Sequence, residues 1–397
     1  MAFNKLTIED VEIKGKRVLI RVDFNAPLDD EGSITDNRKI TAHLPTINYA
    51  LSRDAKIILM SHLGRPNGKV VPKLSLQRIA IKLSELLKAE VSFAGDCIGE
   101  DVQKLVMAMK PKDVILLENL RFHPEEEAND LNFAKELASL GEVYVDDAFS
   151  AVHRAHASIS AITNYFDKAV SGFLLKEEVE YLSRVFLHPE RPICIVLGGA
   201  KVSSKIGVID NLLDKIDKLI IGGGIAYIFL AAGGKNVGNS LLEKDKIEDV
   251  NRILIDAKKY NVEVILPIDY LIADAIKQEA KTQIVTDHIP DGWTGVGIGP
   301  QTVARFTHAL KGAKTIFWNG AMSVFEVEKF SASTYDLANA IANEDALTIA
   351  GGGETDAVID KLGLEEKFSH VSTGGGACLE FLEGKELPGV KVLTNKE

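Results

Sequence analysis

Several features that identify common classes of protein are missing from this sequence of 397 residues. Its three cysteines, Cys97, Cys194 and Cys378, form neither a CxxC pair nor a Cys/His metal-binding spacing. No apolar run reaches the ~18–20 residues that a membrane span needs, and residues 1–16 carry charges throughout, without the apolar core of a secretory signal. We therefore expect a cytoplasmic protein with no membrane partner, whose thiols are small apolar fillers in a reducing compartment.

The short motifs of many nucleotide-binding and hydrolytic enzymes are missing too. The patterns GxxxxGK[ST], GxSxG and HExxH do not occur. The segment "GVGIGP" (295–300) lacks the last glycine of GxGxxG, and no strong ribose-binding acid follows it at the usual spacing. These absences argue against a Walker-type nucleotide site, a zinc protease and a nicotinamide-dependent oxidoreductase.

Basic residues are outnumbered, with 46 Lys and Arg against 57 Asp and Glu, which gives a formal net charge of −11. An acidic chain has no general attraction to nucleic acid or anionic membranes, so we expect neither as a partner. This balance still allows a local basic site.

Short apolar runs alternate with amphipathic, helix-like stretches along the whole chain. Runs that are apolar on both faces are typical of buried parallel strands, and the stretches between them are typical of crossover helices. The sequence therefore predicts an α/β fold with open parallel sheets. The strand-like runs are residues 17–25, 56–61, 113–119, 143–149, 193–199, 218–224, 262–269, 315–320 and 347–353.

A domain boundary is indicated near residues 172–190. Domains usually contain roughly 100–200 residues, so this length favours two domains. The stretch "FLLKEEVEYLSRVF" has apolar residues at helical spacing, and "LHPERP" (187–192) follows with two prolines before the next strand-like run. A helix that bridges two domains explains this pattern, and a crossover helix inside one large domain is the alternative.

The strand ends of the first half carry charged and amide side chains. Ligands of open parallel sheets bind beyond the carboxyl ends of the strands, and arginine matches carboxylate and phosphate groups. We therefore predict a site for a small polyanion. In this site Asp23 and Asn25, an acid and an amide two residues apart, would form hydrogen bonds with a hydroxyl group of the ligand. Ordinary salt bridges, a structural histidine and a turn-capping aspartate are the alternatives. The residues are Asp23, Asn25, Arg38, His62, Arg65, Arg121 and Arg154, with His153 and His156 nearby.

The strand ends of the second half carry glycine instead. Glycine lets the backbone approach a ligand closely, and helix N-termini attract phosphate, so these ends predict a nucleotide site. Lys201 and Lys205 are four residues apart and are expected on one helix face, where they would hold phosphate. Tight turns and solvated lysines are the alternatives. The ends are "LGGAKVSSK" (197–205), "IGGGIAY" (221–227), "GVGIGP" (295–300), "WNGAMSVFE" (318–326), "AGGGETD" (350–356) and "STGGGA" (372–377).

A basic site in one half and a nucleotide site in the other predict phosphoryl transfer. This reaction depends mainly on alignment of the reactants and neutralisation of the moving charge, and the sequence offers no convincing nucleophile. A carboxylate acceptor would need no general base, and closure of two domains would exclude water. The alternative is a two-domain protein that binds nucleotide and anion without turnover.

Nearly the whole chain resembles the phosphoglycerate kinase family. The resemblance rests on an ordered set of segments: "RVDFNAPL", "SHLGRP", "ENLRF", "DDAFSAVHRAHAS", "LGGAKVSSK", "IIGGG", "WNGAMSVFE", "AGGGETDAV" and "STGGGACLEFLEGKELPGV". It implies two Rossmann-like domains with parallel sheets that face each other across a cleft and are joined by a bridging helix. It also implies reversible transfer of the acyl phosphate of 1,3-bisphosphoglycerate to ADP, which gives 3-phosphoglycerate and ATP, with Mg²⁺ and in a monomer.

The resemblance further implies domain limits and residue roles. The implied phosphoglycerate domain is residues 1–172, with about 383–397 packing back onto it, followed by the helix 173–187 and the nucleotide domain 188–382. Arg38, Lys201 and Lys205 would lie at the transferring group. Phosphoglycerate would be held by Asp23, Asn25, Arg38, His62, Arg65, Arg121 and Arg154. The nucleotide would be held by Gly199, Ala200, Lys201, Lys205, Gly223, Asn319, Glu326, Gly352, Gly353, Glu354 and Thr355, with Glu326 at the ribose and Glu354 at the metal.

Four positions depart from the residues that are usual in this family. Glu354 stands where Asp is more frequent, and its extra methylene moves the carboxylate outward. Ala321 replaces a frequent Pro, and Ser323 and Ser150 replace frequent Gly residues. These departures concern the fine geometry of the site, not the reaction class.

Overall fold

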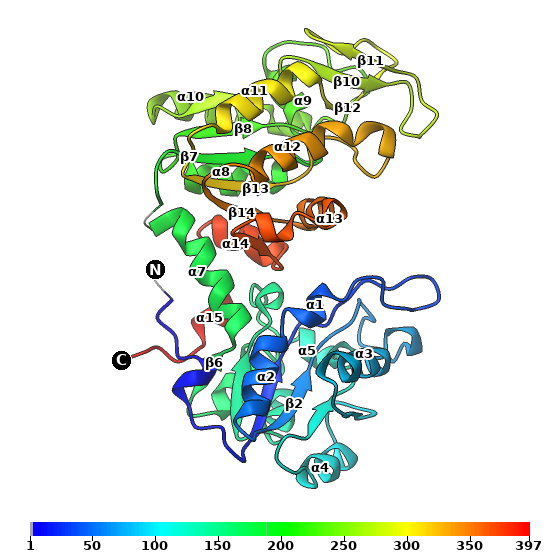
Figure 1. Ribbon diagram of the computed structural model, residues 1–397, viewed down its shortest axis with the longest axis vertical. Helices are drawn as coiled ribbons and strands as arrows, with labels where there is room; N and C mark the ends of the chain where they lie inside the picture. The colour runs from blue at the N-terminus through cyan, green and yellow to red at the C-terminus, as the bar shows by residue number, and fades with distance from the viewer. Residues whose placement is uncertain (1–2, 188) are drawn as a thin grey trace. The chain divides into compact units, whose positions relative to one another are not determined.

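The computed structural model describes residues 3–187 and 189–397 (Figure 1). The chain divides into two compact units: an N-terminal unit, Met1–Glu180 with Glu386–Glu397, and a C-terminal unit, Tyr181–Lys385. Helix α7 (Phe173–Leu187) contains the point at which the first unit ends and the second begins. Among the described helices, none combines the length and the apolar character that crossing a bilayer requires.

A six-stranded parallel sheet in the order β3-β4-β2-β1-β5-β6 forms the centre of the N-terminal unit. The chain first adds strands on one side of β1 and then continues with β5 on the other side. Ligands of such sheets bind at the carboxyl ends beside this reversal of winding. The strands are β1 (Arg17–Arg21), β2 (Lys56–Met60), β3 (Val91–Phe93), β4 (Val114–Leu116), β5 (Val143–Asp146) and β6 (Ala169–Ser171).

The strands of this sheet are apolar because both of their faces are covered. Val18 and Ile20 of β1 lie in one buried cluster with Ile47 and Ile79 from two of the helices, and Leu19, which points to the opposite face, is also fully buried. The helices of this unit before α7 are α1 (Arg38–Thr41), α2 (Leu44–Ser52), α3 (Gln77–Leu87), α4 (Glu100–Met107), α5 (Pro124–Glu127) and α6 (Leu131–Ala138).

The last residues of the chain pack onto this unit, after α15 (Pro388–Lys391). The backbone N–H of Leu6 donates to Thr394 O (2.8 Å), and that of Thr394 donates to Ala169 O in β6 (2.9 Å). The two ends of the chain therefore lie side by side next to β6.

The C-terminal unit contains a second six-stranded parallel sheet, in the order β15-β14-β13-β7-β8-β9. When these six strands are numbered in chain order and the sheet is followed from β9 to β15, they have the doubly wound order 3-2-1-4-5-6. The winding reverses between β7 and β13. Its strands are β7 (Ile193–Leu197), β8 (Lys218–Ile221), β9 (Glu263–Ile265), β13 (Thr315–Asn319), β14 (Leu347–Gly351) and β15 (His370–Ser372). Its helices are α8 (Ile206–Leu212), α9 (Ala226–Ala232), α10 (Ile247–Lys259), α11 (Pro300–Leu310), α12 (Ala332–Ala342), α13 (Gly353–Leu362) and α14 (Gly376–Leu382).

A three-stranded antiparallel sheet, β11-β10-β12, is an addition that the sequence patterns did not predict. Its strands are β10 (Tyr270–Ala273), β11 (Thr282–Val285) and β12 (Thr294–Ile298). Within "GVGIGP", Gly295 and Gly297 lie inside β12, and Gly299 follows the end of this strand directly before α11 (Pro300–Leu310). A Cβ atom on Gly295 would lie 2.3 Å from Tyr227 Cζ, so packing against an aromatic ring is what requires glycine there.

The buried carboxylate of Asp269 caps the N-terminus of α11. It accepts hydrogen bonds from the backbone N–H groups of Gln301 (3.0 Å) and Thr302 (2.8 Å) and from Thr302 Oγ1 (2.6 Å). Free N–H groups at the start of a helix are thus paired with a negative charge.

We expect Asp269→Ala to lower the free energy of unfolding of the C-terminal unit by about 2–3 kcal/mol, because two backbone N–H groups lose a charged acceptor inside the protein. Urea unfolding followed by circular dichroism measures this difference. Asp291→Ala is the matched control, since Asp291 is exposed and accepts one side-chain hydrogen bond from Asn236. Equal losses in both variants would contradict the capping role.

Candidate active site

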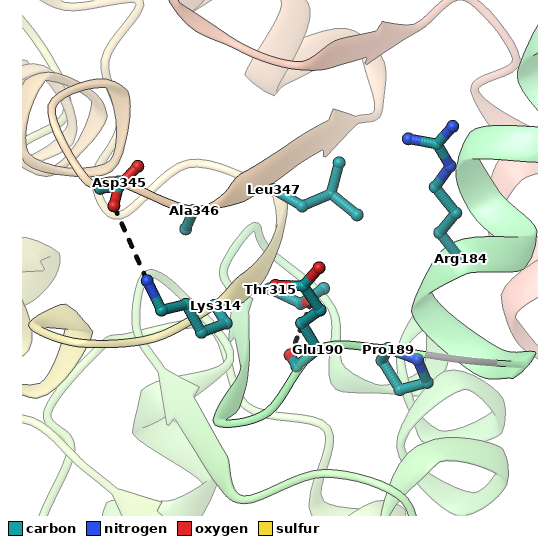
Figure 2. Close-up of a pocket in the computed structure, with 8 residues that line it drawn as sticks. All are labelled: Arg184, Pro189, Glu190, Lys314, Thr315, Asp345, Ala346 and Leu347. Carbon is teal, nitrogen blue, oxygen red and sulfur yellow. Dashed lines mark hydrogen bonds and ion pairs between the residues drawn. The ribbon is translucent and has the colours of Figure 1, made fainter.

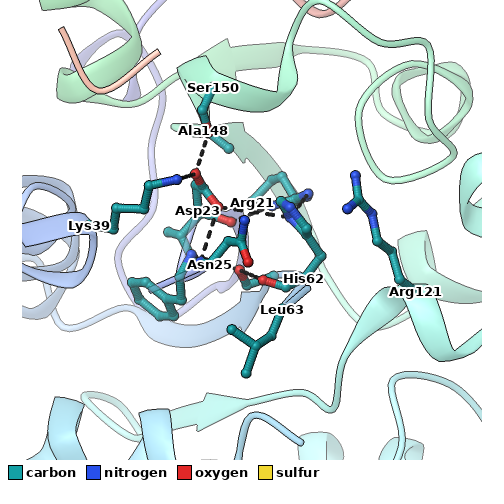
Figure 3. A network of polar contacts seen from close by, with 12 residues as sticks. Arg21, Asp23, Asn25, Lys39, His62, Leu63, Arg121, Ala148 and Ser150 are labelled. Atoms are coloured by element: carbon teal, nitrogen blue, oxygen red, sulfur yellow. Dashed lines mark hydrogen bonds and ion pairs between the residues drawn. The ribbon is translucent and has the colours of Figure 1, made fainter. Parts of the chain in front are cut away.

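Asp23 lies two residues after β1 and forms the centre of a polar cluster (Figure 3). Its Oδ2 accepts hydrogen bonds from Lys39 Nζ (3.0 Å) and from Ser150 Oγ, and its Oδ1 accepts one from the backbone N–H of Asn25 (3.1 Å). Burial alone would raise the pKa of Asp23, but the positive charge of Lys39 and these hydrogen bonds outweigh it and hold the pKa well below its usual range. Asp23 is therefore an ionised carboxylate in a buried position.

His62, which follows β2, is held in one neutral tautomer. Arg21 Nη2 lies 3.2 Å from His62 Nδ1, and because a guanidinium only donates, Nδ1 accepts and the ring proton is on Nε2. Burial lowers the pKa of His62 well below its usual value, and the charges of Arg21 and Arg121 add to this effect, although Asp23 opposes it. The Nε2–H group of His62 is thus a hydrogen-bond donor near the Asp23 carboxylate. Asp23 Oδ1 lies 3.9 Å from the other nitrogen of the ring, Nδ1.

Arg21 is positioned by a buried chain of hydrogen bonds. It is 1% exposed and donates from Nε to Ser158 Oγ (2.9 Å). Ser158 in turn donates from Oγ to Glu126 Oε1 (2.6 Å) and from its backbone N–H to Glu126 Oε2 (2.9 Å). Glu126 therefore sets the orientation of Arg21, and through it the tautomer of His62.

The strand ends at the reversal of winding are joined by His43 and Asp147. The backbone N–H of Asp23 donates to His43 Nε2 (2.9 Å), so the proton of the neutral ring is on Nδ1, which lies 2.8 Å from Asp147 Oδ2. Asp147 Oδ1 accepts from the backbone N–H of Leu174 in α7 (2.9 Å). The loops after β1 and β5 and the start of α7 are thereby held together.

The structure brings some of the predicted anion-binding residues together and leaves others at the surface. Asn25 Oδ1 accepts from the backbone N–H of Gly64 (2.8 Å), and Arg121 Nη1 donates to Gly64 O (3.0 Å), so these two side chains share one loop. Arg38 begins α1, and its guanidinium pairs with Asp36 (2.7 Å).

The other predicted arginines lie outside this cluster. Arg65 and Arg154 are exposed, and Arg154 Nε donates to His153 Nε2 (3.1 Å). Figure 3 shows Arg121 apart from the hydrogen-bonded cluster around Asp23.

Glycine-rich loops line a pocket of about 410 Å³ at the carboxyl ends of β7, β13 and β14 in the C-terminal unit. Its lining includes eight predicted nucleotide residues: Gly199, Ala200, Lys201, Lys205, Asn319, Gly352, Gly353 and Glu354. It also includes Ser204, Gly320, Gly375, Gly376 and Leu379, to which the sequence analysis gave no individual role. Four of these five positions lie in the segments "LGGAKVSSK", "WNGAMSVFE" and "STGGGA", which the sequence analysis named only as glycine-rich ends.

Two of the lining glycines are required by the backbone. Gly320 has φ +94°, and a Cβ there would lie 2.5 Å from Gly198 O. Gly352 has φ +98°, and its Cβ would lie 2.6 Å from Asn319 Nδ2. Larger residues would strain both turns and push the loops apart, which explains glycine at these strand ends.

Lys205 is buried, and its Nζ donates to Asn319 Oδ1. Asn319 Nδ2 in turn donates to Gly351 O (2.5 Å), so the amide orientation is fixed. Burial lowers the pKa of Lys205, while the carboxylate of Glu354 opposes this shift. The pocket thus contains an ammonium group whose hydrogen-bond acceptor is a neutral amide, and it still has N–H donors for an anionic ligand.

The expectation that Lys201 and Lys205 share one helix face is wrong. Residues Val202–Ser204 form a short 3-10 turn, and α8 begins only at Ile206. Lys201 is exposed and Lys205 is buried, so the two ammonium groups lie in different environments although both line the pocket.

Glu354 lies in the first turn of α13 and is exposed to the pocket. Its Oε2 accepts from the backbone N–H of Ala321 (3.2 Å), and next to it Thr355 Oγ1 accepts from that of Gly320 (2.7 Å). Mg²⁺ is usually bound by one or two carboxylates together with substrate phosphates and water. A single carboxylate in the lining of the glycine-rich pocket fits this requirement.

Three predicted nucleotide residues are not in the lining of the pocket. Thr355 is buried and holds the β13 loop, as described above. Gly223 has φ +60°, and a Cβ there would lie 2.4 Å from Ala321 O, so it permits loop packing. Glu326 is exposed, in the segment after β13.

A second hollow of about 460 Å³ lies at the opposite ends of these strands (Figure 2). It is lined by residues at the amino ends of β13 and β14, including Thr315 and Leu347, and by Arg184 of α7. Lys314 and Asp345 in its wall pair with each other (3.7 Å). It is therefore separate from the glycine-lined pocket.

Comparisons with known proteins agree with this architecture. A family model described as phosphoglycerate kinase matches residues 8–385. The chain is 52% identical over 395 residues to a phosphoglycerate kinase of Aquifex aeolicus, with 99% of each chain covered, and 51% identical over 393 residues to one of Moorella thermoacetica, with 99% and 100% covered. The solved structure of phosphoglycerate kinase from Coxiella burnetii superposes with a TM-score of 0.87 at 40% identity, with 98% of each chain covered.

The fold and the comparisons together define a two-domain α/β kinase. More particularly, the chain belongs to the phosphoglycerate kinase family, whose reaction is a phosphate transfer with a carboxyl group as acceptor and a step of glycolysis.

The pKa of His156 depends on the charged residues of the N-terminal site. It is buried, and its Nδ1 lies 3.9 Å from Glu126 Oε1. Burial, followed by the charges of Arg121 and Arg21, lowers the pKa of His156 to about 4. In the unfolded chain this pKa returns to about 6.5. Between pH 6.5 and 4 the unfolded state therefore binds more protons at this residue.

We expect the stability of the wild type relative to His156→Gln to fall as the pH is lowered from 6.5 to 4, and to be constant above pH 7, because the linkage relation ties stability to this difference in bound protons. Urea unfolding of both proteins at several pH values measures the difference, and other titrating groups cancel in the comparison. A difference that does not change with pH would contradict the lowered pKa.

Proposed function

We propose that the cluster around Asp23 binds phosphoglycerate. The ionised Asp23 and the Nε2–H of His62 offer an acceptor and a donor side by side, as recognition of a hydroxyl group requires. Arg121 and Asn25 meet on the loop at Gly64, and Arg38, Arg65 and Arg154 supply further positive charge for a carboxylate and phosphates.

We propose that the glycine-lined pocket binds the phosphates of ADP and ATP. The observation that carries this proposal is Lys205, a buried ammonium group between two glycine-rich loops that donates to a neutral amide. Phosphate oxygens are the charged acceptors that such a donor lacks. The N-terminus of α13 adds backbone N–H groups, and we place the ribose at Glu326.

We propose direct in-line transfer of the acyl phosphate of 1,3-bisphosphoglycerate to ADP. Arg38, Lys201 and Lys205 would neutralise charge on the moving phosphoryl group, and Arg38 would exchange its contact with Asp36 for the substrate. The 3-phosphoglycerate carboxylate is already deprotonated, so the reverse reaction needs no general base. Direct transfer requires the two substrates to meet, and domain closure is the movement that we propose for this step.

We propose that Glu354 helps to hold Mg²⁺ at the nucleotide. The ion supplies charge neutralisation at the phosphate oxygens when bound. Glu354 would orient it, and the hydrogen bond from Ala321 N–H fixes the carboxylate at the pocket.

The expected domain limits, oligomeric state and cellular location stay predictions. They are the phosphoglycerate domain of residues 1–172 with about 383–397, the helix 173–187, the nucleotide domain 188–382, the monomeric state and the cytoplasmic location. The alternative function, binding of nucleotide and anion without turnover, is decided by a direct assay.

We expect turnover with 3-phosphoglycerate, ATP and Mg²⁺, followed as NADH oxidation through added glyceraldehyde-phosphate dehydrogenase. Arg38→Ala should lower it by roughly 10²–10³-fold, as does loss of one donor to a transition state. The control is Arg53→Ala, an exposed arginine that stacks on Tyr49 in the same unit. Absence of turnover with nucleotide still bound in calorimetry would favour the alternative.

We expect Glu354→Gln to lower turnover and to raise the Mg²⁺ concentration needed for half-maximal activity by about tenfold, because a neutral amide is a weaker ligand for a hard cation. A Mg²⁺ titration of the coupled assay measures this shift. Glu366→Gln, an exposed glutamate of the same unit, should behave as the wild type. Identical Mg²⁺ dependence in all three proteins would rule out the metal role.

A further inference from the structure

Three side chains with metal-binding atoms meet at the edge of the N-terminal sheet, outside the polar cluster around Asp23. Asp96 and Cys97 lie in the loop after β3, and His123 follows the short turn Leu120–Phe122 after β4. Asp96 and His123 are 27 residues apart in the sequence. Because β3 and β4 are neighbouring parallel strands, the fold places these loops side by side.

The donor atoms of this cluster are already close together. His123 Nε2 lies 2.7 Å from Asp96 Oδ1, and one ligand atom from each of the three side chains lies within 4.8 Å of the others. Ligand atoms around a tetrahedral zinc ion are about 3.3–3.7 Å apart, given bonds of about 2.0–2.3 Å. The nitrogen and oxygen therefore need to separate by roughly 0.7 Å, and a pair of donors at the 4.8 Å limit needs to approach by about 1.1 Å. The side chains of Asp96 and His123 are partly exposed.

The chemistry of the donors selects the ion. A thiol, an imidazole and a carboxylate together suit Zn²⁺, whereas Mg²⁺ and Ca²⁺ prefer oxygen ligands alone. Three protein ligands leave a fourth position for water, which the exposure of Asp96 and His123 permits. The carboxylate of Asp96, which lies among these donor atoms, favours a cation at this position.

We propose that Asp96, Cys97 and His123 form a Zn²⁺ site. Binding releases the thiol proton to solvent, so that Cys97 ligates as the thiolate. The proton of His123 Nε2, which faces Asp96 Oδ1 in the metal-free protein, is released as well, and Nδ1 takes up a proton from solvent, so that the neutral ring ligates through Nε2. The His123 ring is supported by Phe133, with centroids 5.2 Å apart. The ion joins the loop after β3 to the segment that carries Arg121, and so stabilises the N-terminal unit.

Cobalt spectroscopy on the full chain tests this proposal. Co²⁺ added to the metal-free protein without nucleotide should give a sulfur-to-cobalt charge-transfer band in the near ultraviolet at one equivalent, and Zn²⁺ should abolish it. Cys97→Ser should remove the band, and Asp96→Asn and His123→Gln should each weaken Co²⁺ binding at least tenfold. Cys194→Ala is the control, since Cys194 is buried in β7 and should leave the band unchanged.

Thermal unfolding gives an independent readout if Cys97→Ser folds poorly. A hundredfold excess of Zn²⁺ over its Kd should raise the Tm of the wild type by roughly 5 °C, and the Tm of His123→Gln much less. No sulfur-to-cobalt band in the folded wild type, or a band that survives in Cys97→Ser, would overturn the proposal. Oxygen ligation at Glu354 gives no such band, so a failed result here leaves the kinase proposal untouched.

Discussion

The reversal of winding in each six-stranded sheet is the constraint on which both sites depend. In the N-terminal unit it places the loops after β1, β2 and β5 next to one another, which brings Asp23, His62 and Ser150 together. In the C-terminal unit it places the loops after β7 and β13 next to one another, around Lys205 and Asn319. The same topology thus presents two kinds of loop, one with charged and amide side chains and one rich in glycine, and we propose a different ligand for each.

Burial of charge at these loops is costly, and the structure offsets the cost with fixed partners. Asp23 is ionised between Lys39 and Ser150, whereas burial holds the pKa of His62 well below its usual value and the guanidinium of Arg21 adds to this effect. The chain Glu126–Ser158–Arg21 holds that guanidinium in place. The N-terminal site thus has its protonation states set in advance, which lowers the reorganisation needed when a substrate binds.

Local patterns in the sequence were sufficient for the α/β class, most strands of the two parallel sheets and the two kinds of strand end. Contacts between distant segments were not predictable in this way. The pairs His43–Asp147 and Glu126–Ser158 join residues 104 and 32 positions apart, and no spacing rule indicates them. The antiparallel pairing of β12 was not predicted, because its glycines Gly295 and Gly297 pack against Tyr227 and Ser323, which lie far away in the sequence. Lys201 and Lys205 were misplaced because a 3-10 turn delays the start of α8.

The central claim is that phosphoglycerate and nucleotide are recognised by separate units, each at its own reversal of winding. Amide resonances of the isotope-labelled chain, followed while 3-phosphoglycerate alone is added, test it most directly. The account predicts shifts at Asn25 and Gly64, with none at Gly352 and Gly353. Shifts at the glycine-rich loops with none around Asp23 would contradict it.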